Sequence, residues 1–308
     1  MTALRIATRG SALALAQARW VAARIELQLA QPTELVPIKT SGDRLQGISL
    51  AEVGGKGLFV KEIEEALLEG RADLAVHSAK DLPARLAEGL AVVAWPQRED
   101  PRDALVARER GSRLETLRPK ARLGTGSVRR GAQLRALRAD LEIVPLRGNV
   151  PTRLHKLEAE ALDAVVLACA GLLRLGLGER IDERISTDVV LPAVTQGILA
   201  VEARADSVLA RTLAVLSEAN AERSALAERA FLARLQGDCN LPLAALAEAS
   251  ADGLLRVRGL ISSPDGRTIV RGEARGADPV ATGEAAAQQV LARGGDQVLA
   301  TLRREAAR

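Results

Sequence analysis

The chain of 308 residues has few aromatic, histidine and cysteine side chains, and each shortage excludes a class of protein. Two Trp, two Phe and no Tyr leave few rings on which single-stranded nucleic acid could stack. Two histidines, His77 and His155, cannot form a multi-histidine metal site, so we expect no metal. The two cysteines, Cys169 and Cys239, lie far apart without a CxxC spacing, which argues against a disulfide framework or a zinc knuckle.

Long hydrophobic runs and the common nucleotide fingerprints are also missing. No segment approaches 18 uninterrupted apolar residues, so no membrane span is expected. The apolar stretch at residues 12–18 superficially resembles a signal peptide but leads into an amphipathic pattern, and we interpret it as a helix of a cytoplasmic protein. The absence of a P-loop, of the third glycine of G-x-G-x-x-G and of a G-x-S-x-G elbow argues against phosphate cofactors and Ser-His-Asp hydrolases.

Aliphatic and charged residues are abundant instead. The chain is 47% hydrophobic and 27% charged, which is typical of a globular protein, and its length favours two or three domains. Arginines outnumber lysines by 37 to 6. Coding bias explains the larger part of this excess, but guanidinium groups also bind carboxylates through two parallel hydrogen bonds. A net charge of only +4 and the lack of a long basic run argue against a nucleic-acid partner.

Strand-like and helix-like segments alternate along most of the chain, which predicts an α/β fold with largely parallel sheets. Two stretches begin alike, because a strand runs through Ser11 into a helix and another runs through Ser127 into a helix. We therefore expect two related lobes facing a cleft. The pattern changes near Asn220, where a long helix, two strands and Ala-rich helices predict a smaller α+β domain. The predicted boundaries are 1–97 with 194–217 for lobe 1, 98–193 for lobe 2, and 218–308 for the C-terminal domain.

A short polar cluster follows the strand predicted at residues 74–76. Residues 77–81 read His-Ser-Ala-Lys-Asp, and Pro83 disfavours helix at the residue before it. α/β proteins place their chemistry where strands leave the core, so this cluster is a candidate site. The alternative is a solvated turn in which Asp81 pairs with Lys80.

The two strand–serine–helix junctions are candidate anion sites, because amide groups at a helix start are unpaired and the helix dipole favours negative charge there. Arg9 lies beside the first junction. Arg129 and Arg130 occupy the first turn of the second helix, where positive side chains are unfavourable unless an anion is present. With Arg147 and Arg153 on a third turn, the pattern predicts a polycarboxylate or phosphate ligand. Pairing of Arg129 and Arg130 with a nearby Asp or Glu is the alternative.

The two cysteines differ in their surroundings. Cys239 follows Asp238 on a turn bracketed by Gly237 and Pro242, and an exposed loop thiol can be a nucleophile or an attachment point. Cys169 lies within an apolar run and is expected to be an inert core thiol.

Six motifs, in this order, resemble those of the porphobilinogen deaminase (hydroxymethylbilane synthase) family. They are RIATRGS at 5–11, VGGKGLF at 53–59, AVHSAKD at 75–81, REDPRDA at 98–104, LRGNV at 146–150 and LPAV at 191–194. The similarity extends from about residue 4 to past residue 300. It implies two periplasmic-binding-protein-like (type II) lobes around a cleft and a smaller third domain that carries a cysteine.

The resemblance also implies an activity in tetrapyrrole and heme biosynthesis. A dipyrromethane cofactor would be joined to Cys239 by a thioether, and four porphobilinogen molecules would be added head to tail with loss of ammonia. Hydrolysis would then release hydroxymethylbilane. We expect a monomer with a small-molecule substrate and no membrane or nucleic-acid partner. A non-catalytic binder of small carboxylates is the alternative, but it would not explain Cys239.

Individual residues receive roles from the same resemblance. Asp81 is the implied catalytic residue, which would stabilise the azafulvenium cation left by ammonia and shuttle protons. The implied cofactor-binding residues are Cys239, Ser78, Lys80, Asp81, Ser127, Arg129, Arg130, Arg147 and Gly148. The implied substrate-binding residues are Arg9, Ser11, Lys56, Arg147, Arg153 and Gln196.

Four positions depart from the usual family pattern. Gly126 stands where serine is common, Thr195 and Asp238 stand where glycine is usual, and Pro151 enters the start of a helix. We expect Gly126 to remove a hydroxyl from the anion site and Thr195 to alter local flexibility. An anion at Asp238 should raise the pKa of the adjacent thiol.

Overall fold

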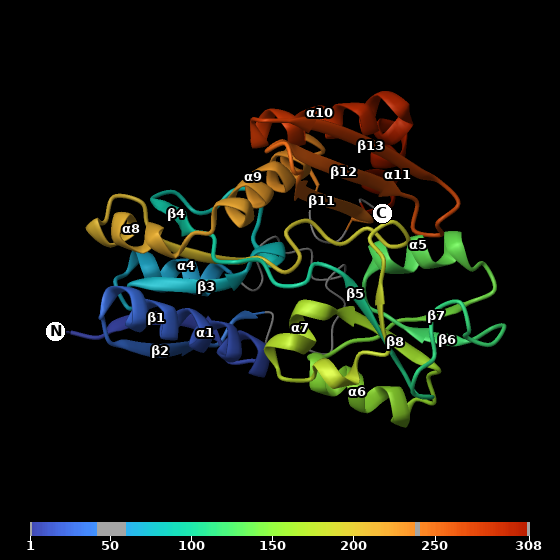
Figure 1. Ribbon diagram of the computed structural model, residues 1–308, viewed down its shortest axis with the longest axis horizontal. Helices are drawn as coiled ribbons and strands as arrows, with labels where there is room; N and C mark the ends of the chain where they lie inside the picture. Colours follow the sequence, from blue (N-terminus) through green and yellow to red (C-terminus); the bar gives the residue numbers. More distant parts are fainter. Residues whose placement is uncertain (1, 42–59, 238–240, 307–308) are drawn as a thin grey trace. The chain divides into compact units, whose positions relative to one another are not determined.

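The computed structural model describes residues 2–41, 60–237 and 241–306. The chain forms two compact units, the first from residues 1–99 and 198–225 and the second from residues 100–197 and 226–308 (Figure 1). The division into three domains stays a prediction, since the second unit contains both the predicted lobe 2 and most of the C-terminal domain. Among the described residues, no helix is both long and apolar enough to cross a membrane.

The first unit is built on a five-stranded sheet in the order β2-β1-β3-β10-β4. The first three strands are parallel, whereas β10 is antiparallel to both of its neighbours. The strands are β1 (Leu4–Arg9), β2 (Thr33–Ile38), β3 (Leu74–Ser78), β4 (Leu90–Ala94) and β10 (Leu199–Arg204). The helices are α1 (Ala12–Leu29), α4 (Lys61–Leu68), η1 (Ala79–Asp81), α8 (Val208–Leu213) and η3 (Ala214–Leu216), and α9 (Ala219–Arg234) begins in this unit.

Helix α1 shows how the sequence builds this unit. The Ser11 side chain caps it by accepting a hydrogen bond from the Ala14 amide at 3.3 Å. Its buried face packs against β1 and β3, where Val21 and Ile25 join Leu74 in one apolar cluster. The expected strand, serine cap and helix are therefore confirmed. Their order places Ser11 beside the end of β1.

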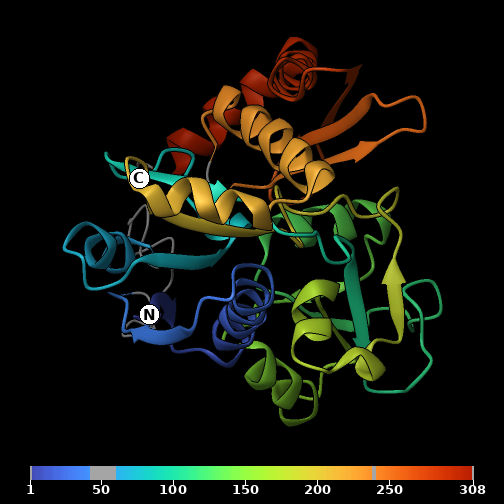
Figure 2. The same ribbon diagram turned by 60° about the vertical axis from the view of Figure 1, so that its left-hand side comes forward.

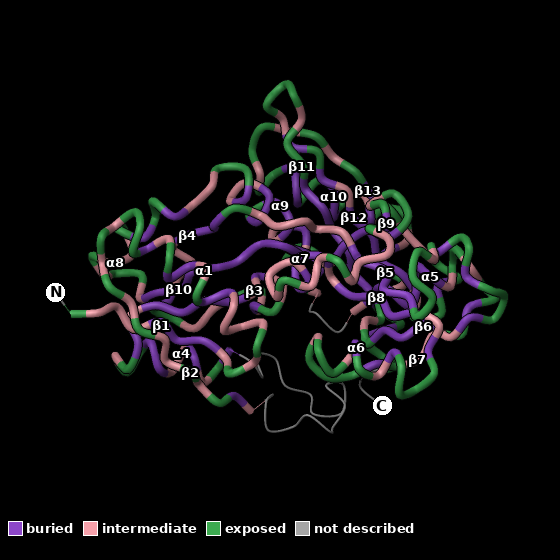
Figure 3. Tube along the Cα trace, turned by 60° about the horizontal axis from the view of Figure 1, so that its bottom comes forward, coloured by how far each residue is buried: buried purple, intermediate pink, exposed green. Residues whose placement is uncertain are grey.

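The second unit contains a five-stranded sheet in the order β7-β6-β8-β5-β9. The first three strands are again parallel, and β5 is antiparallel to both of its neighbours. The strands are β5 (Asp103–Ala107), β6 (Arg122–Gly124), β7 (Glu142–Val144), β8 (Ala164–Ala168) and β9 (Glu183–Ile185). The helices are α5 (Val128–Leu137), α6 (Val150–Ala159), α7 (Cys169–Arg174) and η2 (Gly178–Arg180). Figure 3 shows β5 and β8 as the buried centre of this sheet.

The two sheets have the same strand order and the same directions, so β1 corresponds to β6 and β3 to β8. Both β1 and β6 lead into helices capped by a serine, Ser11 and Ser127. The predicted similarity of the two strand–serine–helix units is therefore confirmed at the level of topology, as is the fold class. The expectation of largely parallel sheets was wrong in one respect: each sheet is mixed, because its fourth strand runs against its neighbours. The cleft between the lobes stays a prediction.

The remainder of the second unit is a three-stranded antiparallel sheet in the order β11-β12-β13, covered on one side by α10 (Figure 2). Its strands are β11 (Leu243–Ala249), β12 (Leu255–Ser262) and β13 (Ile269–Gly276). The helices that follow are α10 (Pro279–Val290), η4 (Leu291–Gly295) and α11 (Asp296–Ala306). This is the expected smaller α+β part, with β11 as a strand that the sequence did not predict.

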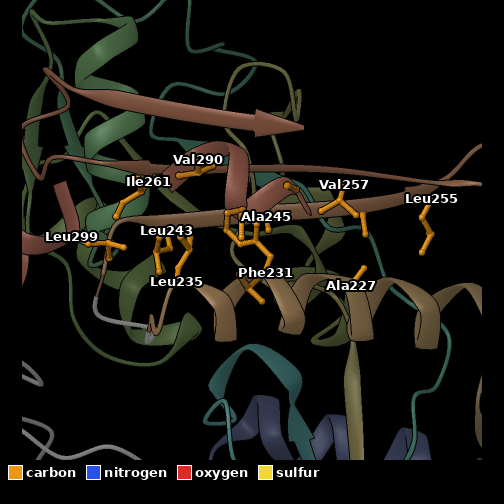
Figure 4. Packing of buried hydrophobic residues seen from close by; sticks show 14 of the residues in the cluster. Ala227, Phe231, Leu235, Leu243, Ala245, Leu255, Val257, Ile261, Val290 and Leu299 are labelled. Carbon is orange, nitrogen blue, oxygen red and sulfur yellow. The ribbon is translucent and has the colours of Figure 1, made fainter. Parts of the chain in front are cut away.

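Phe231 of α9 is the centre of the core in this part of the chain (Figure 4). Its side chain is fully buried among Leu243, Val257 and other apolar residues. β12 passes directly over the ring: a Cβ added at Gly259 would lie 2.1 Å from ring atom Cε2. A glycine is therefore required where the strand crosses the ring.

We predict that Phe231→Ala lowers the free energy of unfolding by about 3–5 kcal/mol, because a large cavity replaces the ring. Leu226→Ala, on an exposed position of the same helix, should change it by less than about 1 kcal/mol. Denaturation in guanidinium chloride, followed by circular dichroism, measures both. Equal effects of the two substitutions would contradict the central role of Phe231.

Candidate active site

Four sequence-predicted residues, each at an end of a different element, line one pocket of the first unit. Arg9 ends β1, Ser11 caps α1, Ser78 ends β3, and Asp81 ends η1; the pocket has a volume of about 60 Å³. All four lie at or just after the ends of β1 and β3, which are parallel neighbours in the sheet, as expected for an α/β site. The structure thus brings together a guanidinium group, two hydroxyls and a carboxylate.

A rigid turn presents the Asp81 carboxylate. Within η1, Ala79 is buried and its amide donates to the carbonyl of Ile198 at 3.0 Å. Leu82, the residue after η1, is also buried, and its amide donates to the carbonyl of Ala79. Asp81 itself is exposed, while Lys80 is half-buried. Buried residues on both sides of Asp81 therefore hold its backbone in place while its side chain faces solvent and the pocket.

Two buried residues that belong to this site were missed by sequence reasoning: Gln17, which lines the pocket, and Glu202, which contacts the lining residue His77. Gln17, on the buried face of α1, donates from Nε2 to Oγ of Ser78 at 2.8 Å. Glu202, on β10, lies 2.9 Å from Nε2 of His77, and both side chains are buried. The register of β10 against β3 creates the second contact, and it joins residues 125 positions apart. Only the helical spacing of Gln17 within α1 could have indicated its role.

The His77–Glu202 pair affects a second carboxyl nearby. Burial raises the pKa of Glu64 above its usual range, and the charge of Glu202 adds to that effect. The amide of Ala87, which donates to Glu64 at 3.1 Å, and the ring of His77 oppose it. Two carboxyl groups, those of Glu64 and Glu202, therefore interact with His77, which lines the pocket.

In the second unit, the two predicted anion-binding arginines lie in a buried cluster with Asp103. Nη1 of Arg129 donates to Oδ2 of Asp103 at 2.5 Å, and Nε and Nη2 of Arg130 donate to Oδ1 at 2.9 and 2.7 Å. Gln196 completes the cluster by donating from Nε2 to Oδ1 at 2.9 Å. The alternative interpretation from the sequence, pairing with a nearby Asp, therefore describes the contacts that these arginines make.

The electrostatics of this cluster still fit an additional anion. Burial acts to raise the pKa of the Asp103 carboxyl, but the charges of Arg129 and Arg130 outweigh it and hold that pKa well below its usual range. Burial lowers the pKa of Arg129, and Asp103 opposes this while Arg130 adds to it. Within residues 2–41, 60–237 and 241–306, no group accepts a hydrogen bond from Nε of Arg129. Two guanidinium groups and one carboxylate leave one net positive charge at the start of α5, so the residues fit an anionic group such as dipyrromethane.

The third predicted anion-binding turn lies between β7 and α6. Asn149 caps α6 by accepting from the Thr152 amide at 2.9 Å, and Gly148 adopts a φ of +109°. Nε of Arg153 donates to the carbonyl of Gly148 at 2.7 Å, while Arg147 is exposed. The turn therefore keeps Arg153 against its own backbone and leaves Arg147 to the solvent.

Three of the departures from the family pattern have structural explanations. A Cβ at Gly126 would lie 2.4 Å from the carbonyl oxygen of Leu146, so the missing hydroxyl is accompanied by a backbone that requires glycine. Thr195 keeps a left-handed φ of +58°, which costs roughly 1–2 kcal/mol for a residue with a Cβ. The Glu228 carboxylate stabilises it by accepting from the Thr195 amide at 2.5 Å. Pro151 lies in the first turn of α6, where proline is favourable.

Two predicted site residues, Lys56 and Cys239, lie outside the described residues, as does Asp238. Ser127 is half-buried at the start of α5 and caps it through the amide of Arg130. How the residues of the first unit face those of the second stays a prediction. Among the described residues, no group of three or more His, Cys, Asp or Glu side chains could hold a metal ion.

Cys169 is a buried free thiol at the start of α7. Burial raises the pKa of this thiol to about 12, and the charges of Asp100 and Asp103 contribute. The thiolate is the reactive form, so Cys169 is inert near neutral pH.

We predict that iodoacetamide leaves Cys169 unmodified in the native protein at pH 8, because the thiol is both buried and protonated. Modification should appear only after unfolding or near pH 12. Peptide mass mapping of the alkylated protein measures this. Alkylation of native Cys169 at pH 8, at the rate of the unfolded chain, would contradict the prediction.

Comparisons with known proteins identify relatives of the whole chain. The family model described as "Porphobilinogen deaminase, dipyromethane cofactor binding domain" matches residues 4–212, and "Porphobilinogen deaminase, C-terminal domain" matches residues 222–292. A porphobilinogen deaminase from Syntrophus aciditrophicus is 51% identical over 299 residues, which cover 95% of this chain and 96% of the relative. One from Roseiflexus sp. is 52% identical over 303 residues, covering 96% and 98%.

Among solved structures, a periplasmic substrate-binding protein of an ABC transporter from Coxiella burnetii is similar to this chain. The two share 13% sequence identity with a TM-score of 0.41, over 73% of this chain and 96% of that one.

Proposed function

The chain belongs to the porphobilinogen deaminase family, and from this we propose that Asp81 is its catalytic carboxylate and that its arginines hold the acidic arms of cofactor and substrate. It is a transferase of tetrapyrrole biosynthesis with a dipyrromethane cofactor. It condenses four porphobilinogen molecules head to tail with release of ammonia and forms hydroxymethylbilane.

The observation that carries the role of Asp81 is the pocket in which Arg9, Ser11, Ser78 and Asp81 meet. Porphobilinogen carries two carboxylate arms and an aminomethyl group on a pyrrole ring. Arg9 and the two hydroxyls can receive a carboxylate arm, while the Asp81 carboxylate can accept a hydrogen bond from the pyrrole N–H. One pocket thus provides for both the acidic and the reacting part of the substrate.

The reaction places a transient positive charge on the substrate. When the bond between the aminomethyl carbon and nitrogen breaks, the nitrogen leaves as ammonia and the ring system becomes cationic. A carboxylate fixed beside the pyrrole N–H stabilises that charge without reorganising, which is the largest single contribution in many enzymes. The same carboxyl can supply a proton to the leaving nitrogen and later accept the proton released from the ring carbon that forms the new bond.

In the second unit, we propose that Arg129 and Arg130 bind carboxylate arms of the cofactor. Dipyrromethane, when bound, supplies the pyrrole carbon to which the first substrate molecule is joined. Two observations support this role: the net positive charge of the Asp103 cluster, and Nε of Arg129, which has no hydrogen-bond acceptor among the described residues. Arg147 is exposed on the adjoining turn, with Arg153 beside it, and we propose both for the arms of substrate and growing chain.

We also propose that Cys239 carries the cofactor through a thioether and that Lys56, Lys80 and Gln196 assist in binding. Cys169 supports the choice of sulfur, since its buried, protonated thiol is unsuited to attachment. We propose further that the enzyme acts as a cytoplasmic monomer without a nucleic-acid partner. The low net charge of +4 supports the last point.

We predict that Asp81→Asn lowers kcat by at least about 100-fold, because the amide can neither stabilise the cation nor transfer the proton. Unfolding of the variant should match the wild type, since Asp81 is exposed. Asp206→Asn, at an exposed carboxylate of the same unit, should leave kcat unchanged. Turnover is followed with porphobilinogen by oxidising the product to a coloured porphyrin. Near-normal turnover of Asp81→Asn would remove Asp81 from the mechanism.

We predict that the purified enzyme has the intact mass of the chain plus two pyrrole units and that Cys239→Ser lacks the increment. After unfolding, the wild type should show one free thiol per chain, that of Cys169. Two free thiols in active enzyme would exclude the thioether. A chain that binds porphobilinogen without an adduct or turnover would instead support the alternative function, a carboxylate-binding protein.

A further inference from the structure

We propose that Asp103 is a positioning residue: it fixes Arg129 and Arg130 before any ligand arrives and leaves their cluster with the charge to accept one carboxylate. This inference rests on the proposed role of the two arginines in binding the cofactor. Asp103 would act without touching the cofactor, through the two arginines alone. The charge of the cluster would also limit the number of carboxylate arms that it binds.

Both carboxylate oxygens of Asp103 accept hydrogen bonds from the arginines. Nε and Nη2 of Arg130 donate to Oδ1, and Nη1 of Arg129 donates to Oδ2 at 2.5 Å. The three side chains are at most 6% exposed. Such charge-assisted hydrogen bonds, shielded from water, are stronger and more directional than those of surface ion pairs.

Backbone carbonyl groups complete the support of both guanidinium planes. Nη1 of Arg129 donates to the carbonyl of Leu191 at 3.0 Å, and Nη1 of Arg130 donates to that of Val166 at 3.2 Å. Gln196, which donates to Asp103, also donates to the carbonyl of Pro101 at 2.7 Å. These contacts tie the start of α5 to β8 and to the segments before β5 and β10. Both arginine side chains are already ordered before a ligand binds. Binding therefore costs little of their conformational entropy.

The charge of the cluster determines what it accepts. Two guanidinium groups against one carboxylate leave a single buried positive charge, and the dipole of α5 adds to the positive potential. A buried, uncompensated charge is unfavourable, so one incoming carboxylate relieves it whereas a second would reverse it. Nε of Arg129, which meets no acceptor in the part of the chain that the structure describes, offers a donor for that carboxylate. Without Asp103 the cluster would have two positive charges, and its arginines would lose their common anchor.

The test compares variants with different cluster charge, made in a host that cannot synthesise porphobilinogen so that the chains lack cofactor. Asp103→Asn leaves two net positive charges, the wild type one, and Arg129→Gln none. Thermal unfolding in sodium sulfate and in sodium chloride of equal ionic strength should show a sulfate-induced rise in Tm that decreases in this order. Asp140→Asn, which breaks an exposed ion pair with Arg138, is the matched control and should respond as the wild type does.

Cofactor assembly gives the second readout. Porphobilinogen is added to the cofactor-free chains, and the fraction that carries cofactor is measured by intact mass. The porphobilinogen concentration that loads half of the chains should rise about tenfold or more in Asp103→Asn. This is the size of effect seen when a metal ligand loses its supporting partner. Asp103→Glu, which restores the charge with a longer arm, should recover part of the loading. The double variant Asp103→Asn/Arg129→Gln should regain the wild-type response to sulfate but not the loading.

Three outcomes would overturn the proposal. They are wild-type loading by Asp103→Asn, a sulfate response of Arg129→Gln as large as that of the wild type, and a double variant that loads normally. If Asp103→Asn does not fold, the comparison of Arg129→Gln with the wild type still decides the charge rule. Normal loading by Arg129→Gln would instead show that the proposed function of the arginines is wrong, whatever the role of Asp103.

Discussion

The antiparallel fourth strand of each five-stranded sheet delivers a buried carboxylate to the back of a site. In the first sheet, β10 places Glu202 against His77; in the second, β5 places Asp103 against Arg129 and Arg130. His77 lies on β3, whereas Arg129 and Arg130 lie on helix α5, which follows β6. Both β3 and β6 belong to the parallel strands of their sheets. In each sheet, one antiparallel strand thus brings a buried carboxylate into contact with residues of the candidate site.

The related sheets have diverged in what their equivalent loops carry. β3 ends in Ser78 and leads to Asp81, whereas the equivalent strand β8 leads into Cys169 and the apolar start of α7. The carboxylate is exposed and the thiol is buried with a pKa of about 12. The carboxylate that we propose for catalysis therefore follows β3 of the first unit, and the equivalent position after β8 offers only a buried thiol. In the second unit, the arginines follow β6 and β7, where positive charge can receive acidic groups.

Local signals in the sequence predicted those elements whose determinants are local. Ser11 and Ser127 cap their helices as expected, and the pattern around Leu74 gave the correct strand. β11 was missed because Leu243 to Ala249 is rich in alanine, a strong helix former, and becomes a strand only through its pairing with β12.

The residues of the candidate site also differ in how far local sequence signals could predict them. Arg9, Ser78 and Asp81 could be predicted because they lie at or just after the ends of two strands, β1 and β3. The partners Glu202 and Asp103 could not, since their contacts depend on the register of strands distant in sequence. From the sequence, the partner of the two arginines could be an external anion or an internal acid. The structure shows the internal acid, Asp103, and binding of an external anion stays a proposal.

Gly126 illustrates how such a site constrains its own evolution. The carbonyl of Leu146 occupies the space that a side chain at this position would need. A serine at this position would therefore displace the turn that carries Arg147 and Gly148, unless that turn changed at the same time. The effect of a substitution at position 126 should thus depend on the residues of the neighbouring turn.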